Sequence, residues 1–351
     1  MMRDLVKITN ISIIMLVICT GLIWAGDGQI DIAILPYTIS SSGSYVVVKD
    51  LSLSTQDTNG ITISADNVTI DLNGHSLTGP GNSTGTDGSG IYIEPTHYNI
   101  AIHNGTVLNW RQTGINGANS ANSQFENLRC YNNGFRGLFA GSISRVVGNT
   151  CYQNLDAGII TGNGCYINGN ACSYNGNCGL NAGLGSIVSG NSCTNNTTEG
   201  IYAGAGCQIS NNSCHANTAE GIQVTGSGTI VNNSCTSNSG LAGIYAGASF
   251  IYGNNCLYNT KDGILASSNS KVMNNNCVSN GYPTGDGAGI NVAGSDSCIE
   301  NNLVTNNDRG IDCNPGTGNY IASNRASGNT TNYDILGSNT QGTGDLANVA
   351  F

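Results

Sequence analysis

The sequence predicts an all-β fold, a parallel β-helix (β-solenoid) with about 21 residues per coil. Three observations predict this fold. Cysteines recur at one spacing, columns of asparagine, glycine and aliphatic residues keep the same period, and charged residues make up only 9% of the 351 residues. Fixed periods of about 20 to 50 residues are typical of repeat proteins, whose stacked units share one continuous core. A hydrophobic content of 39% is sufficient for such a core.

The cysteine column sets the period. Stacked coils place equivalent side chains one above the other, so we expect this column to consist of buried free thiols that act as small apolar fillers. A line of thiols lacks the convergent ligands of a metal site and the Cβ spacing of about 3.8 Å that a disulfide needs. The column is Cys130, Cys151, Cys172, Cys193, Cys214, Cys235, Cys256 and Cys277. The pairing of five other cysteines is left open: Cys165, Cys178, Cys207, Cys298 and Cys313.

Three other columns keep the period of the cysteines. Asparagines stand two residues before and three residues after the cysteines, as Asn212 and Asn217 do around Cys214. A Gly-Ile or Gly-Leu step closes each coil, and an apolar residue stands five positions before each cysteine. We expect the asparagines at bends, because asparagine tolerates the left-handed backbone and can bond the asparagine of the next coil. Short alternating stretches broken by Asn and Gly exclude a helical repeat.

The N-terminus has the pattern of a secretory signal peptide, which we expect to span residues 1–25. Arg3 and Lys7 precede the apolar stretch Ile11 to Ile23, and Ala25 follows as a cleavage site. The stretch is shorter than a typical membrane span, so a mature chain without a transmembrane span is expected, with an uncleaved anchor as the alternative. The expected destination is secreted, periplasmic or cell-surface. The further divisions are an N-terminal cap with first coils at 26–95, the β-helix at 96–335 and a C-terminal tail at 336–351.

The charge balance argues against nucleic acid as a partner. The formal net charge is −10, and the chain has only 11 basic residues, which are scattered. Phosphate binding depends on clustered Lys and Arg. An acidic surface is compatible with neutral sugars, cations or cationic partners.

With these motifs, the chain resembles the bacterial right-handed parallel β-helix repeat proteins of the pectin-lyase-like superfamily. Residues 60–75, GITISADNVTIDLNGH, are similar to their first coils, and 324–335 resemble their final ones. The resemblance covers about 30–335 and implies a right-handed helix, but this fold hosts unrelated functions. The sequence lacks the catalytic motifs of the polygalacturonase-like, pectate lyase-like and mannuronan epimerase-like members, and Gln56-Asp57-Thr58 matches the pectin methylesterase-like motif only in letters. No catalytic residue is carried over.

Aromatic residues on the expected outer face are the candidate substrate-binding residues. Phe139, Tyr202 and Tyr245 each follow the Gly-Ile or Gly-Leu step, and flat rings on a sheet suit the apolar faces of sugars. An insertion of about five residues after Cys277 adds Tyr282 and Asp286. Insertions in solenoids form loops that often mark the binding face.

The residue before the Gly step is acidic in Glu199, Glu220 and Asp262, which are the candidate catalytic residues. Stacked carboxylates repel one another unless a cation or a raised pKa relieves them, so an acid–base pair and a calcium site are both open, beside plain solvated turn residues. Apart from this calcium site, no cofactor and no metal ligand is expected. The sequence favours polysaccharide binding. The alternatives are a polysaccharide lyase, hydrolase or epimerase with a divergent site, and a structural or adhesin-like surface protein without a small ligand.

Overall fold

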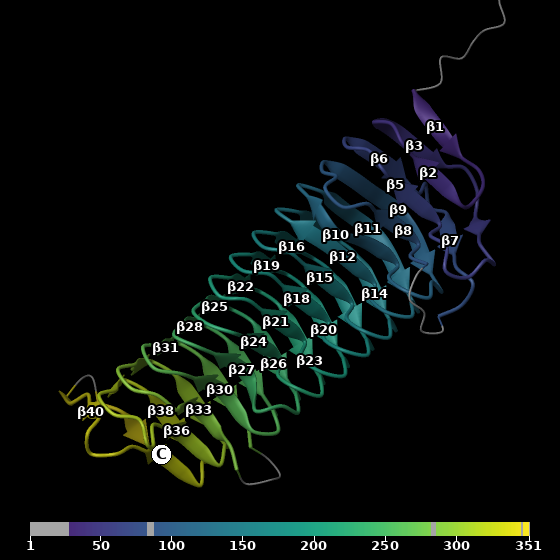
Figure 1. The fold of residues 1–351 in the computed structure, drawn as a ribbon. Coiled ribbons are helices and arrows are strands. Elements are labelled where there is room, and N and C mark those ends of the chain that lie inside the picture. The colour runs from purple at the N-terminus through teal and green to yellow at the C-terminus, as the bar shows by residue number, and fades with distance from the viewer. Residues whose placement is uncertain (1–27, 83–87, 282–285, 345–346, 351) are drawn as a thin grey trace, which may run out of the picture.

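The computed structural model describes residues 28–82, 88–281, 286–344 and 347–350. Within these ranges the chain winds into a long solenoid, with β1 (Gln29–Ile32) near one end and β40 (Thr340–Gln341) near the other (Figure 1). The same ranges contain no α-helix, and no helix in them is long and apolar enough to cross a membrane. The expected signal peptide lies outside the described residues. The boundaries at 95/96 and 335/336 stay predictions.

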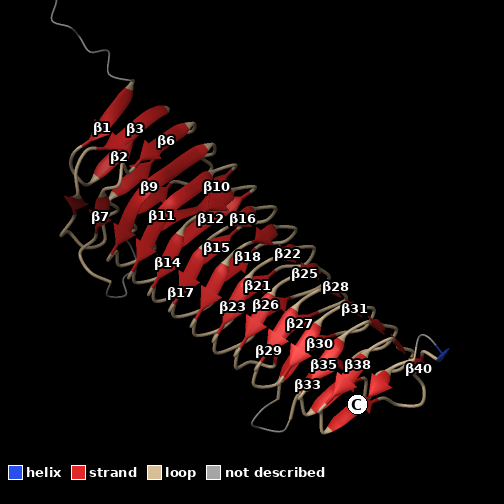
Figure 2. Ribbon diagram, turned by 180° about the vertical axis from the view of Figure 1, so that it is seen from behind, coloured by secondary structure: helices blue, strands red, loops and turns tan. Residues whose placement is uncertain are grey.

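One strand of each coil belongs to a 14-stranded parallel sheet. Its strands are short, as expected where every coil must turn three times, and Figure 2 shows them stacked along the solenoid. In order they are β2 (Tyr37–Ile39), β5 (Ile61–Ile63), β8 (Ile91–Ile93), β10 (Ile115–Ala121), β12 (Leu138–Ser142), β15 (Ile159–Thr161), β18 (Leu180–Ala182), β21 (Ile201–Ala203), β24 (Ile222–Val224), β27 (Ala242–Ala246), β30 (Asp262–Ala266), β33 (Ala288–Val292), β36 (Arg309–Asp312) and β39 (Thr331–Asp334).

The other strands form a 27-stranded sheet with two banks. The first bank holds β1, β3 (Gly43–Val47), β6 (Val68–Asp71), β9 (Ile100–Leu108), β11 (Gln124–Tyr131), β13 (Arg145–Val147), β16 (Tyr166–Asn168), β19 (Ile187–Ser189), β22 (Gln208–Ser210), β25 (Thr229–Val231), β28 (Phe250–Tyr252), β31 (Lys271–Met273), β34 (Cys298–Glu300), β37 (Tyr320–Ala322) and β40. The second bank holds β4 (Leu51–Ser52), β7 (Ser76–Thr78), β14 (Thr150–Tyr152), β17 (Ala171–Ser173), β20 (Ser192–Thr194), β23 (Ser213–His215), β26 (Ser234–Thr236), β29 (Asn255–Leu257), β32 (Asn276–Val278), β35 (Leu303–Thr305), β38 (Arg325–Ser327) and β41 (Val349–Ala350). The long strands β9 and β11 span both banks.

The cysteine column is the buried ladder that the spacing predicts. Cys193 pairs in register with Cys214, and Cys214 with Cys235, on adjacent parallel strands. All eight column cysteines are fully buried and free. The pKa of the Cys214 and Cys235 thiols is raised, because burial in the core disfavours the thiolate. The five cysteines left open by the sequence are free as well, and only Cys298 among them is partly exposed.

Two asparagine ladders run through the core, as predicted. Asn212 donates from Nδ2 to Oδ1 of Asn233 at 3.0 Å and to the Val188 carbonyl at 3.0 Å. Its Oδ1 accepts two bonds, from the backbone N–H and from Nδ2 of Asn191. One ladder is Asn149, Asn170, Asn191, Asn212, Asn233, Asn254, Asn275, Asn302 and Asn324, and the other is Asn133, Asn154, Asn175, Asn196, Asn217, Asn238, Asn259, Asn280 and Asn307. Each buried amide is thus satisfied by the coils on both sides.

The left-handed residues differ from the expectation. The positive φ angles fall on the residue just before each ladder asparagine, as in Asn195 (55°), Asn211 (56°) and Ala216 (53°), and not on the ladder asparagine itself. The bend needs the left-handed residue, and the next residue then turns its side chain inward, where the amide can bond the neighbouring coils. Tyr174 and Tyr258 also occupy such bends, so the position is not reserved for asparagine.

A third polar ladder marks the remaining corner of the coil, and the sequence analysis missed it. The backbone N–H of Ser144 donates to Sγ of Cys165 at 3.4 Å, and that of Cys165 to Oγ of Ser186 at 3.1 Å. The column continues at the same period with Cys207, Gly228, Ser249 and Ser270. Cys165 and Cys207 are therefore corner residues, in places where other coils have serine.

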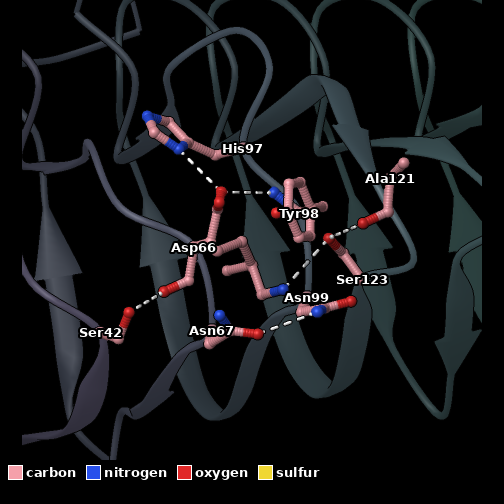
Figure 3. A network of polar contacts seen from close by, with 9 residues as sticks. Ser42, Asp66, Asn67, His97, Tyr98, Asn99, Ala121 and Ser123 are labelled. Carbon is pink, nitrogen blue, oxygen red and sulfur yellow. Dashed lines mark hydrogen bonds and ion pairs between the residues drawn. The ribbon is translucent and has the colours of Figure 1, made fainter.

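The first coils add polar contacts on the surface (Figure 3). Oδ1 of Asp66 lies 2.9 Å from Nδ1 of His97 and accepts from the backbone N–H of Tyr98 at 3.1 Å. The hydrogen bond from His97 lowers the pKa of the Asp66 carboxyl. Asn99 donates to the side chain of Asn67 at 2.9 Å, and both residues have left-handed backbones. These bonds join successive coils outside the core.

Candidate functional site

The outward column of the 14-stranded sheet is the surface that the sequence analysis singled out. Tyr202, Gln223 and Tyr245 occupy this column in three consecutive coils, each paired in register with the next. Each follows the inward Ile of its strand, so strand alternation turns it to the outside. All three are half-buried. The two tyrosines lie two coils apart, about 10 Å along the solenoid.

Phe139 stands in the same column but is separated from the tyrosines. Ile160 and Asn181 lie between Phe139 and Tyr202. The guanidinium of Arg136 covers the Phe139 ring at 4.7 Å from its centroid, and its Nε binds Oδ2 of Asp156 at 3.1 Å. A ring already stacked by a cation offers less free surface to a ligand.

A first hollow lies beside Tyr245. Its volume is about 300 Å³, and Gln223 and Tyr245 form part of its wall. The full lining is Gln223, Val224, Thr225, Tyr245, Gly247 and Ser267. The hollow thus combines one aromatic ring with amide and hydroxyl groups.

A second hollow, of about 170 Å³, follows the first along the sheet. Leu265, the next residue in the outward column after Tyr245, lines it. The remaining lining residues are Leu241, Lys261, Asp262, Asp286, Asn291 and Arg309. The structure therefore brings together Asp262 and Asp286, which the sequence analysis named for different reasons.

Asp262 is the most perturbed carboxyl group of this hollow. It is only 7% exposed, and its Oδ1 and Oδ2 accept hydrogen bonds from the Ala288 N–H (2.6 Å) and from Nδ2 of Asn291 (3.0 Å). Burial raises its pKa to about 6, although those bonds and the charge of Arg309 act in the opposite direction. This carboxyl group therefore changes its charge close to neutral pH.

Arg309 lies among carboxylates from two coils. Its Nη2 is 3.4 Å from Oδ1 of Asp286, and its Nε is 3.1 Å from Oδ2 of Asp312. Burial also raises the pKa of Asp312. The side chains of Asp286 and Arg309 are 70% and 30% exposed, so the ion pair between them is open to solvent.

Glu199 and Glu220 do not join this group. They precede Asp262 in the same column of the coil, but the second hollow is lined by Asp262 and not by either glutamate. Oε1 of Glu220 accepts the Leu241 N–H at 3.0 Å, so this buried carboxylate caps a turn of the next coil. Across the described ranges, no group of three or more His, Cys, Asp or Glu side chains is placed to hold a metal ion. Tyr282 lies outside the described residues.

Three polar residues of the second hollow were not among the residues predicted from the sequence: Lys261, Asn291 and Arg309. A signal for Arg309 was present, since it precedes Gly310-Ile311 in the position that Asp262 has before Gly263-Ile264. A coil between Asp262 and Arg309 is longer than the regular period, so the two residues are not a whole number of periods apart and the match is not apparent from the spacing. Asn280 bonds Asn307, 27 residues on, where the preceding coils of this ladder keep a spacing of 21.

Comparisons with known proteins agree with this architecture. Residues 185–330 match the family model described as a right-handed beta helix region. The A-module of the Azotobacter vinelandii mannuronan C-5 epimerase AlgE4 superposes with a TM-score of 0.56 at 14% identity, covering 84% of this chain and 89% of that one. The chain is a right-handed parallel β-helix protein.

A second structure supports the same fold. The A-module of the A. vinelandii mannuronan C-5 epimerase AlgE6 matches this β-helix protein with a TM-score of 0.53 at 14% identity, covering 93% of this chain and 91% of that one. At this identity the likeness shows the fold alone. A search of the curated proteins found no match to the sequence.

This β-helix protein has a second aromatic surface, on the 27-stranded sheet. The rings of Tyr131 and Tyr152 are stacked with centroids 5.6 Å apart, and Tyr174 meets Tyr152 edge-on at 5.6 Å. Tyr131 and Tyr174 are exposed. Neither of the two hollows described above is lined by these three rings. The surface therefore serves as a comparison for the column that carries Tyr202 and Tyr245.

Proposed function

We propose that the protein is secreted or displayed at the cell surface and binds a polysaccharide along the outward column of the 14-stranded sheet. One observation carries the proposal: Tyr202, Gln223 and Tyr245 stand in consecutive coils, and the last two line a hollow of about 300 Å³. Tyrosine rings stack on the apolar faces of sugars, and the phenol and amide groups can bond their hydroxyls. The column continues straight along the solenoid, which suits a long chain of repeating sugars.

The structural neighbours support the same class of ligand. Both A-modules are named as mannuronan C-5 epimerases, so this fold is used elsewhere by proteins that act on a polysaccharide. The fold alone does not carry a function over. The proposal of polysaccharide binding therefore depends on the tyrosine column, and the neighbours are consistent with it.

A glycan array followed by titration calorimetry tests the proposal. We expect the parent protein to bind at least one polysaccharide, and the double change Tyr202→Ala with Tyr245→Ala to weaken binding about tenfold or more, since ring stacking is lost. The matched control is Tyr131→Ala with Tyr152→Ala, which removes one exposed and one half-buried tyrosine from the other sheet. Circular dichroism spectra and melting temperatures of both variants should stay close to those of the parent.

Two outcomes would contradict the proposal. Loss of binding in the control pair alone would place the ligand on the other sheet. Absence of any glycan ligand would leave the structural or adhesin-like role.

Cleavage of the bound polysaccharide is a second candidate function, which the buried carboxyl group of Asp262 favours. A carboxyl group with a pKa of about 6, in a hollow next to Arg309, has the properties of a general acid. Release of reducing ends from the glycan that binds would be the evidence for cleavage. Asp262→Asn should then abolish turnover and leave binding measurable, and equal turnover by the variant and the parent would exclude this role.

A further inference from the structure

The two hollows lie next to each other along the outward column and together define one path, because Tyr245 lines the first and Leu265, its partner in the next coil, lines the second. Beyond Leu265 the column continues with Asn291, Asp312 and Asp334, each paired in register with the next. A glycan that stacks on Tyr202 and Tyr245 and extends in this direction therefore passes Leu265 and Asn291 and then two consecutive aspartates, of which Asp312 is largely buried.

Acidic side chains outnumber basic side chains along this path. The second hollow contains Lys261 and Arg309 beside Asp262 and Asp286, and Asp312 and Asp334 follow in the column. The guanidinium of Arg309 already has the carboxylates of Asp286 and Asp312 at 3.4 and 3.1 Å. A uronate that approached Arg309 would have to compete with these two carboxylates, and the net charge of −10 repels polyanions at longer range.

We infer that the ligand of this path is an uncharged, hydroxyl-rich polysaccharide and not a polyuronate. This inference rests on the proposed function and adds the substrate class to it. It also separates this chain from the two mannuronan epimerase modules, whose named substrate is a polyuronate.

The hydrogen-bonding groups of the path match sugar hydroxyls. A hydroxyl both donates and accepts, so it can satisfy a carboxylate such as Asp286 on one side and an amide or ammonium group on the other. Asn291, Lys261 and Gln223 supply such groups along the two hollows. The ionised carboxylate of a uronate only accepts hydrogen bonds, so this group meets like charge without a proton to share when it is placed beside Asp262 or Asp286.

The test compares oligosaccharides that differ in charge and share a backbone. β-1,4-Mannohexaose and the β-1,4-mannuronate hexamer differ only at C6, and cellohexaose, xylohexaose, maltohexaose and a galacturonate hexamer complete the panel. Titration at low ionic strength and about pH 7.5 should show at least one neutral hexamer binding about tenfold more tightly than either uronate, because juxtaposed like charges are costly. Raising the ionic strength should narrow that ratio, since salt screens the repulsion.

The variant Asp286→Asn tests whether the acidic side chains cause the preference for neutral hexamers. Asp286→Asn removes one of the two carboxylates that engage Arg309, at a side chain that is 70% exposed, so the fold should be retained. The ratio of uronate to neutral affinity should rise at least about threefold in this variant. A uronate hexamer that binds the parent more tightly than every neutral hexamer would overturn the inference and leave the proposed function intact. Failure of all six to bind, together with a glycan array that shows no ligand, would overturn both.

Discussion

Asn212 and Asn233 lie one coil apart in the core, and the Nδ2 of the first donates to Oδ1 of the second at 3.0 Å. The backbone N–H of Asn212 donates to the same oxygen at 2.9 Å. One side chain therefore satisfies two donors of the preceding coil, and each link of the ladder depends on the next. The coils are joined by side chains as well as by strand pairing.

Removal of one link should be costly. Asn212→Ala leaves two donors of Asn191 without their acceptor, so we expect the free energy of unfolding to fall by about 1–3 kcal/mol or more. The matched control is Gln208→Ala, which removes an amide of the same coil from an exposed strand position. Urea denaturation measures both variants. Equal losses would mean that the buried ladder contributes no more than a surface amide.

The bend before the ladder should tolerate glycine. Ala216 has a φ of 53°, a conformation that costs residues with a Cβ about 1–2 kcal/mol. Ala216→Gly removes that strain at the expense of a more flexible unfolded chain, so stability should be unchanged or higher by up to about 1 kcal/mol. Ala205, which is not among the left-handed residues, is the control: Ala205→Gly should lower stability. A clear loss in Ala216→Gly would refute this account of the bend.

The thiols of the core should be protected from reagents. Native protein treated with a maleimide should be labelled at Cys298, which is partly exposed, and the buried column from Cys130 to Cys277 should react only after denaturation. Mass spectrometry of peptides from the native and the denatured samples identifies the sites. Column cysteines found as disulfides, or labelled in the native state, would contradict the ladder.

The carboxyl group of Asp262 should couple stability to pH. Its pKa is raised from 3.8 to about 6 on folding, so the folded state holds this proton more tightly than the unfolded chain. The resulting stabilisation is fully present below about pH 4 and is lost as the pH rises through 6, by at most about 3 kcal/mol.

The variant Asp262→Asn has no titratable group at this position. The free energy of unfolding of the parent minus that of the variant should therefore fall between about pH 4 and pH 7.5. Urea denaturation across this range measures the difference, which also cancels the effects of other carboxyl groups. A difference that does not change with pH would mean that folding does not raise the pKa of Asp262.

The regular coils were predictable from the sequence because a period of 21 residues marks each inward position. Cys193, Asn191 and Asn196 reveal their place by recurring, and Tyr202 and Tyr245 reveal theirs by following an inward Ile. The third ladder, which includes Ser144 and Ser186, has the same period. Its positions are occupied by Ser, Cys or Gly, so no single residue type marks it in the sequence.

The second hollow was only partly predictable. Asp262 and Asp286 could be named, but their meeting with Arg309 depends on the enlarged coil between Asn280 and Asn307, whose 27-residue spacing breaks the period. The raised pKa of Asp262 depends on its burial, which a turn position in the sequence does not reveal.

A crystal structure of the protein with its tightest-binding neutral hexasaccharide tests the central claim most directly. We predict sugar rings over Tyr202 and Tyr245, with hydroxyl groups in the hollows lined by Gln223 and Asp262. Sugar bound instead over Tyr131 and Tyr152 on the 27-stranded sheet, with the outward column bare, would contradict it.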